Sequence, residues 1–198
     1  MGYRRLARTE LPVDTAALAR FLVGKAVVRE TPQGVLSGII VETEAYVVGD
    51  AAGHAYRGIT PRTRSLFLEP GHAYIYLSYG RSYMLNVSSE AVGIGAGALI
   101  RALEPLEGVA IMQRNRRTER LRDLTRGPGR LAEALEIGPW ADGLDLCQEG
   151  PLWLAHGDRD AGEIGQGVRI GLSREADRPL RFHVRGNRFV SGPRSLNA

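Results

Sequence analysis

The chain has 198 residues, 43% of them hydrophobic, which is enough apolar material for one large domain or two small ones. Apolar runs stay well short of the about 18 residues that a transmembrane helix needs, and the first residues lack the apolar segment of a signal peptide. A net charge of +4 favours acidic partners modestly, and Lys25 is the only lysine. A GC-rich genome, which encodes arginine in place of lysine, is the simpler explanation of the arginine bias.

The single cysteine, Cys147, excludes an internal disulfide and argues against a zinc or iron–sulfur centre held by cysteines. We therefore expect a reducing, cytoplasmic setting, next to the nucleoid in a bacterium, and no membrane association. Histidine and cysteine residues at ligand spacing are missing, so we expect no metal and no other cofactor.

Apolar periodicity and turn residues predict elements along the whole chain. In chain order, we expect a helix at 15–23, strands at 25–30 and 35–46, a short helix at 61–68, strands at 73–79, 83–89 and 98–103, helices at 106–116 and 127–137, and late strands within 151–157, 163–173 and 178–186. The first helix has an N-cap at Asp14 or Thr15 and stops at Gly24. Long strands with few helices indicate a mixed α+β fold.

The strand at 35–46 ends in acidic and aromatic residues. Because side chains alternate along a strand, Glu42, Glu44 and Tyr46 share one face of the sheet. A solvated polar face is the plainer interpretation. The loop of small residues that follows, ending near His54, favours a functional site instead. His54 is then either a hydrogen-bonded structural residue or a ring that contacts a base.

The hairpin predicted at 73–89 carries several tyrosines. Tyr74 and Tyr76 share one face, while Tyr79 falls in the turn beside Arg81. Tyr79 is either an exposed aromatic or a wedge that enters the minor groove while Arg81 or Arg64 contacts phosphate. Such a wedge fills the space left by an extruded nucleotide.

Two polar residues interrupt apolar strands. A buried Asn86 needs hydrogen-bond partners and serves structure or reads a base edge. An arginine inside ALIRAL, Arg101, needs a carboxylate or a phosphate. Glu44 is a natural partner, and the pair would keep the carboxylate ionised. The segment GPGRL at 127–131 is an ordinary helix start or a phosphate-binding one.

Together the motifs resemble the alkyladenine (3-methyladenine) DNA glycosylase family, of the monomeric, animal-like type, from about Leu11 to Ser191. The most specific matches are VETEAY at 41–46, His54, TPR at 60–62, PGHAYIYLSYG at 70–80, Asn86, LIRALEPLEG at 99–108, GPGRL and PLRFHVRG at 179–186. The resemblance implies one α+β domain over 1–198, with its core at about 11–191. That domain has a curved antiparallel sheet, flanking helices and a protruding β-hairpin.

The resemblance also implies roles at the reaction centre. Glu44 matches the catalytic base of the family, and Arg101 matches an arginine that helps to hold the attacking water and the DNA backbone. Ile170 falls where a main-chain carbonyl helps to hold that water.

Further roles concern the DNA. Residues that match the base-binding pocket are Tyr46, His54, Tyr76 and Asn86, the last of which screens base identity. Tyr79 matches the intercalating tyrosine, and we expect Arg64 and Arg81 at the DNA backbone. Thr63 stands where the family often has asparagine.

The expected function is base excision: flipping an alkylated or deaminated purine out of double-stranded DNA and hydrolysing its N-glycosidic bond with a water activated by Glu44. We expect a monofunctional enzyme, because Lys25 lies outside any motif and amines form the Schiff base of enzymes that also cut the strand. The resemblance implies that the enzyme is a monomer. Two alternatives stay open: a hydrolase of free nucleosides, and a non-catalytic nucleic-acid-binding module that stacks bases on tyrosines.

Overall fold

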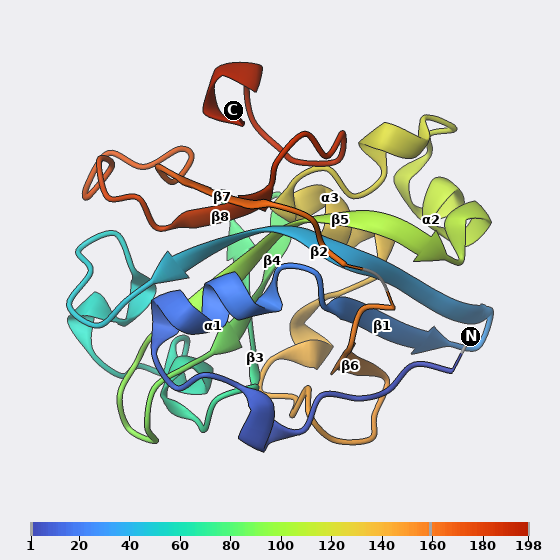
Figure 1. Ribbon diagram of the computed structural model, residues 1–198. Helices are drawn as coiled ribbons and strands as arrows, with labels where there is room; N and C mark the ends of the chain where they lie inside the picture. The colour runs from blue at the N-terminus through green and yellow to red at the C-terminus, as the bar shows by residue number, and fades with distance from the viewer. Residues whose placement is uncertain (1, 159, 198) are drawn as a thin grey trace.

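A computed structural model describes residues 2–158 and 160–197 as a curved antiparallel sheet with helices packed on it (Figure 1). The sheet has eight strands, in the order β3-β4-β5-β2-β1-β6, with β8 beside β2 and β7 beside β8. The strands are β1 (Ala26–Thr31), β2 (Gly34–Tyr46), β3 (Ala73–Ser78), β4 (Ser82–Ser88), β5 (Gly97–Glu107), β6 (Leu152–Ala155), β7 (Ile164–Gly167) and β8 (Arg181–Val184). The α+β class predicted from the sequence is confirmed.

Strand β2 is the centre of the sheet. Along one edge it pairs with β5, from Ser37 opposite Glu107 to Tyr46 opposite Gly97. Its other edge is divided: the first half pairs with β1 and residues 42–44 pair with β8. The strand that carries the acidic residues is therefore flanked on both sides by hydrogen-bonded neighbours.

Three α-helices and six short 3-10 helices connect the strands in the described part of the chain. They are α1 (Thr15–Leu22), α2 (Val109–Arg116) and α3 (Pro128–Ala134), with η1 (Arg8–Glu10), η2 (His54–Arg57), η3 (Arg64–Phe67), η4 (Leu121–Asp123), η5 (Pro139–Ala141) and η6 (Arg194–Leu196). Helix α1 begins where predicted, because the Asp14 side chain accepts a hydrogen bond from the Ala17 amide at 2.7 Å.

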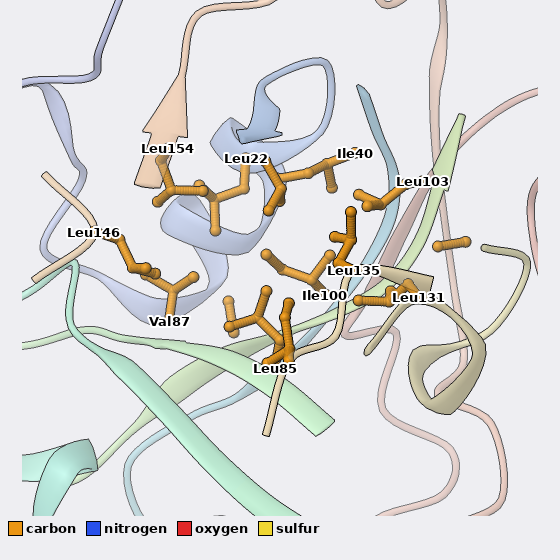
Figure 2. Close-up of a cluster of buried hydrophobic side chains, with 14 of the residues drawn as sticks. Leu22, Ile40, Leu85, Val87, Ile100, Leu103, Leu131, Leu135, Leu146 and Leu154 are labelled. Atoms are coloured by element: carbon orange, nitrogen blue, oxygen red, sulfur yellow. The ribbon is translucent and has the colours of Figure 1, made fainter. Parts of the chain in front are cut away.

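The hydrophobic core lies between one face of the sheet and helices α1 and α3 (Figure 2). Leucines of both helices, among them Leu22 and Leu131, meet Ile40 of β2, Leu85 of β4 and Ile100 of β5 there. Burial of these aliphatic side chains provides the main driving force for the fold. The opposite face of β2 is left for polar side chains.

Several element boundaries differ from the prediction. Strand β5 continues to Glu107, so α2 begins only at Val109. The apolar periodicity of the sequence predicted the start of this helix too early, because Leu106 and Glu107 remain in the strand beside β2. Gly108, at φ +75°, then turns the chain from strand to helix, a conformation that glycine adopts without steric cost. The predicted helix at 61–68 is the single 3-10 turn η3, and the late strands are shorter than expected.

Strands β3 and β4 form the predicted hairpin, with Ser78 opposite Ser82 at its tip. Among residues 2–158 and 160–197, no helix is long and apolar enough to cross a membrane.

Candidate active site

A cavity of about 450 Å³ opens where the end of β2, the β3–β4 hairpin and the start of β5 meet. Its volume lies in the range of small-molecule sites. Seven of the residues predicted to form the site line it: Tyr46, His54, Tyr76, Tyr79, Asn86, Arg101 and Ile170. Residues up to 124 positions apart in sequence therefore contribute to one wall, as Tyr46 and Ile170 do.

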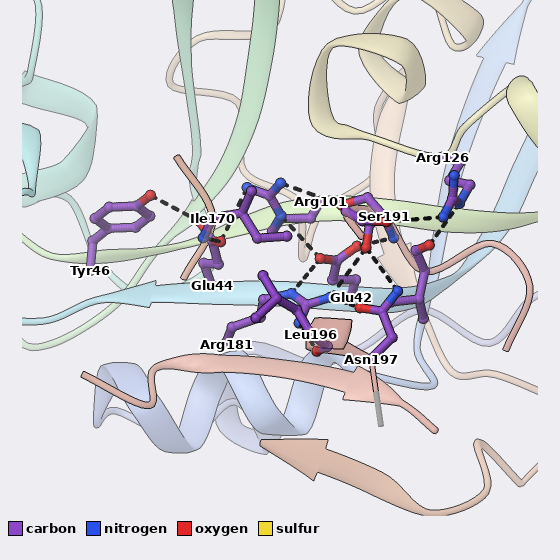
Figure 3. A network of polar contacts seen from close by, with 12 residues as sticks. Glu42, Glu44, Tyr46, Arg101, Arg126, Ile170, Arg181, Ser191, Leu196 and Asn197 are labelled. Carbon is purple, nitrogen blue, oxygen red and sulfur yellow. Dashed lines mark hydrogen bonds and ion pairs between the residues drawn. The ribbon is translucent and has the colours of Figure 1, made fainter. Parts of the chain in front are cut away.

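Glu44 lies one layer behind this wall, fully buried. Its Oε1 accepts hydrogen bonds from the Ile170 amide at 2.7 Å and contacts Arg101 Nη1 at 3.1 Å, and its Oε2 accepts from the Tyr46 hydroxyl at 3.0 Å (Figure 3). All three partners line the cavity. The structure thus rules out a solvated polar face for this part of β2 and shows Ile170 contacting Glu44 through its N–H.

Alternation along β2 explains how the carboxylates reach this face. Val41 and Ala45 point into the core, and Thr43 between them donates its hydroxyl hydrogen to the Ala19 carbonyl of α1 at 2.7 Å. Glu42 and Glu44 therefore project from the opposite face, where Arg101 of the neighbouring strand β5 also lies. The β2–β5 register is irregular on both sides of Glu42, which adapts the two strands to this buried polar cluster.

Arg101 bridges the two acidic residues. Its Nε donates to Glu42 Oε1 at 3.1 Å, while its Nη1 faces Glu44. The same Glu42 oxygen accepts from Arg181 Nε at 2.6 Å. Burial alone would raise the pKa of Glu42, but the charges of Arg101 and Arg181 outweigh it and hold that pKa below its ordinary value. Glu42 is therefore a fixed anion that orients Arg101.

The C-terminal segment completes this network. The Ser191 amide donates to Glu42 Oε2 at 2.6 Å. The Arg181 guanidinium, fully buried, donates through its remaining nitrogens to the Leu196 carbonyl at 2.7 Å and to the Asn197 side chain at 2.6 Å. Leu196 and Asn197, which matched no motif, thus help to enclose the charges behind the cavity (Figure 3).

Three aromatic side chains form one side of the cavity. The His54 and Tyr76 rings lie 4.3 Å apart at 70°, and His54 Nδ1 shares a hydrogen bond of 2.9 Å with the Tyr74 hydroxyl. Burial lowers the pKa of His54, and the nearby positive charge of Arg62 lowers it further. Burial raises the pKa of Tyr74 to about 12. At neutral pH the pocket therefore presents uncharged, electron-rich rings.

Asn86 is the polar residue on the neighbouring strand β4. Its side-chain amide donates to the Tyr74 carbonyl at 3.1 Å and to the Met84 carbonyl at 3.4 Å, which fixes its orientation at the cavity wall. These hydrogen bonds to the main chain of the hairpin show that Asn86 has a structural function.

The hairpin tip presents Tyr79 to solvent. Its side chain is 94% exposed, and its backbone takes a left-handed conformation with φ 48°. Arg81 beside it is exposed, as is Arg64 at the start of η3. These two arginines do not line the cavity, whereas Arg62, for which the sequence suggested no role, does. The Arg62 guanidinium lies 5.8 Å from the Tyr76 ring centre, and the TPR motif at 60–62 was the available signal.

A second missed pair supports the loop that carries Ile170. Arg169 and Asp50 are both buried and form an ion pair, and Arg169 Nη1 also donates to the Ala45 carbonyl at 3.0 Å. The Arg169 guanidinium stacks 4.7 Å from the Tyr46 ring centre. In the described ranges, no group of three or more histidine, cysteine, aspartate or glutamate side chains could hold a metal ion.

Comparison with known proteins identifies the family. The model of the methylpurine-DNA glycosylase family matches residues 9–188, nearly the whole chain. The chain belongs to this family. Membership in the methylpurine-DNA glycosylase family makes it a DNA-binding glycosylase of DNA repair, and it confirms the resemblance found in the sequence motifs.

Close relatives of this glycosylase occur in diverse bacteria. A Mesorhizobium japonicum protein is 70% identical over 191 residues, covering 96% of this chain and 92% of its own length. A Paraburkholderia phytofirmans protein is 53% identical, with 96% and 90% covered, and one from Rubrobacter xylanophilus is 50% identical, with 89% and 92% covered. All three bear the name "Putative 3-methyladenine DNA glycosylase".

Proposed function

We propose that this glycosylase flips a damaged purine out of double-stranded DNA into the aromatic cavity and hydrolyses its N-glycosidic bond with a water activated by Glu44. The observation that supports it most is the position of Glu44, buried directly behind the cavity and bonded to three cavity-lining groups. The family and the names of the relatives point to methylated purines such as 3-methyladenine as substrates.

The hydrogen bonds of Glu44 leave room for a water. An ionised carboxylate accepts at about four positions. Two contacts occupy Oε1 and one occupies Oε2, so Oε2 keeps an acceptor position beside the Tyr46 hydroxyl. We assign this position to the attacking water when the base is bound. The negative charge then also stabilises the oxocarbenium character that develops on the sugar.

A second carboxylate is not needed as an acid. Ordinary glycosidases use an acid and a base, because their leaving groups are poor. Glu42 is the nearest other carboxylate on β2, and the two arginines keep it ionised. An alkylated purine already carries positive charge and leaves without protonation. The electron-rich faces of Tyr76 and Tyr46 favour such a cation, by about 0.5–2 kcal/mol for a cation–π contact.

The hairpin tip supports base flipping. The Tyr79 side chain is 94% exposed, so burial in the core does not explain an aromatic residue at this position. As a wedge it fills the gap left by the flipped nucleotide and slows its return.

The decisive experiment measures base release from duplexes that each carry one defined lesion, under single-turnover conditions. Wild-type protein should release the base, and Glu44→Gln should be slower by about 10²–10⁴-fold, the usual contribution of a general base. Glu163→Gln, which alters an exposed ion pair with Arg185, is the matched control and should remain active.

Two outcomes would refute the proposal. Release by Glu44→Gln at the wild-type rate would exclude Glu44 as the base. Equal release from free nucleosides and from duplex DNA would identify a nucleoside hydrolase, for which the exposed Tyr79 has no function.

A further inference from the structure

A second cavity, of about 430 Å³, lies beside the C-terminal segment and is rich in arginine. Its lining consists of Arg122, Arg126, Val184, Gly186, Asn187, Arg188, Val190 and Asn197. Three arginines thus line one concave surface, outside the aromatic cavity described above.

Main-chain carbonyls hold two of these arginines in place. Arg122 Nε donates to the Arg188 carbonyl at 3.1 Å. Arg126 donates from Nε to the Val190 carbonyl at 2.8 Å and from Nη2 to the Gly192 carbonyl at 3.2 Å. Arg122 makes this hydrogen bond through its Nε, and its two terminal nitrogens make none within the described ranges. The arginines are therefore positioned in advance, with donors still available.

The positive charge of this cluster is only partly balanced by acidic residues. Among the described residues, no acidic side chain forms an ion pair with Arg122, Arg126 or Arg188, since the neighbouring Asp123 pairs with Arg130 at 2.9 Å. Burial lowers the pKa of Arg126, and the charges of Arg122 and Arg130 lower it further, against the opposing effect of Asp123 and Glu42. A bound anion stabilises a cluster of this kind.

The two cavities have no lining residue in common, but neighbouring residues of the chain line them. Arg126 lines the arginine cavity, and two residues later Pro128 lines the aromatic one. Gly192, which accepts the Arg126 hydrogen bond, packs so closely on Ile170 that a Cβ at position 192 would lie 2.6 Å from the Ile170 side chain. Figure 3 shows Arg126 and Tyr46 at opposite ends of the polar network around Glu42 and Glu44.

We propose that the arginine cavity binds a backbone phosphate of the same DNA whose damaged base occupies the aromatic cavity. The inference rests on the proposed function. Guanidinium groups match phosphate oxygens in charge and in their forked geometry, and a preformed cluster holds the strand in register without reading its sequence. Free inorganic phosphate offers the same chemistry, so the experiment has to separate the two sources.

The test uses R122Q/R188Q, which leaves Arg126 intact because Arg126 also holds the main chain of 190–192. The measurement is the affinity for an undamaged duplex as a function of salt concentration. Each phosphate contact contributes about 0.9 to the slope of log K against log salt. The variant should lower that slope by about 1 to 2 and weaken binding at low salt at least tenfold. R122K/R188K should retain most of the wild-type slope.

The matched control is R4Q/R20Q, which removes two arginines that line neither cavity. It should leave the slope nearly unchanged. If R122Q/R188Q melts well below the wild type, the salt dependence should be measured with R188Q alone. This substitution should leave the fold intact, because the Arg188 side chain makes no hydrogen bond within the described residues.

The outcomes separate the two proposals. An unchanged slope in R122Q/R188Q, together with wild-type base release, overturns the phosphate site alone. Tight binding of inorganic phosphate that depends on Arg122 and Arg188, with an unchanged DNA slope, identifies a free-anion site and also overturns it. Failure of the wild-type protein to release any base overturns the proposed function, while the slope on undamaged DNA still tests the phosphate site.

Discussion

Glu42 and Glu44 project from the same face of β2, two residues apart, and both are fully buried. Two like charges so close would repel each other in an apolar interior. Arg101 between them and Arg181 on the far side of Glu42 supply the compensating charge. Glu42 is thus the residue that allows two arginines and a second carboxylate to share a small buried volume.

Replacing Glu42 by glutamine should therefore cost stability. The variant keeps an acceptor oxygen but leaves the charges of Arg101 and Arg181 with one carboxylate fewer, and breaking a buried ion pair costs about 3 kcal/mol. Base release should also slow about tenfold, because the hydrogen bond that holds Arg101 Nε loses its charged acceptor and positions Arg101 less firmly. Urea unfolding and single-turnover kinetics measure the two effects.

Glu163→Gln serves as the control here too, since an exposed pair such as Glu163 with Arg185 contributes about 0–1 kcal/mol. A Glu42→Gln variant as stable as this control would show that the buried charge is dispensable.

Tyr79→Ala should weaken base flipping without affecting the fold. The side chain is 94% exposed, so its removal should leave the melting temperature within about 1–2 °C of the wild type, as for other surface substitutions. A fluorescent base analogue at the lesion should report a smaller flipped population, and Tyr79→Phe should restore most of it. Equal flipping signals in Tyr79→Ala and the wild type would count against the wedge.

No covalent enzyme–DNA intermediate should form at a lysine. Lys25, the sole lysine, does not line the aromatic cavity, and its ammonium group lies 4.6 Å from the Phe21 ring centre, beside α1. Borohydride added during turnover should trap little or no protein on DNA, and Lys25→Met should release bases at the wild-type rate. A high yield of trapped complex that disappears in Lys25→Met would contradict a water nucleophile.

Acid should destabilise the protein through His54 and the buried His183. Burial lowers the pKa of His54, with a contribution from Arg62, and that of His183, with a contribution from Arg181. The unfolded chain therefore binds more protons than the folded one as the pH falls below the ordinary histidine value of about 6.5. The free energy of unfolding should be largest above that pH and should fall below it.

Chemical denaturation at several pH values between about 5 and 8 checks this expectation. His183→Phe, at a buried position, should show a shallower decline than the wild type. A wild-type stability that rises on acidification would contradict the direction assigned to both histidines.

The sequence was most informative where local patterns determine structure. The Asp14 cap, the alternation through Glu44 and the tyrosine hairpin each depend on neighbouring residues only, and the structure contains all three. The Glu44–Arg101 pair was also predictable, because an arginine in an apolar strand requires an anion.

Ion-pair partners that are distant in sequence could not be predicted in the same way. Nothing near Arg181 indicates that it shares Glu42 with Arg101, since the three residues lie on three strands that meet only in the folded sheet. The buried Arg169–Asp50 pair joins two loops separated by 118 intervening residues. The boundary of α2 was misplaced for the same reason, because pairing with β2 keeps Leu106 in a strand.

The divided edge of β2 has a consequence for synthesis on the ribosome. Residues 42–44 obtain their second neighbour from β8, at 181–184, far along the sequence. A nascent chain therefore has to expose residue 184 outside the ribosome before both edges of the strand that carries Glu44 are paired. Catalytic competence should appear only after that point of synthesis, later than the formation of α1 and the first hairpin.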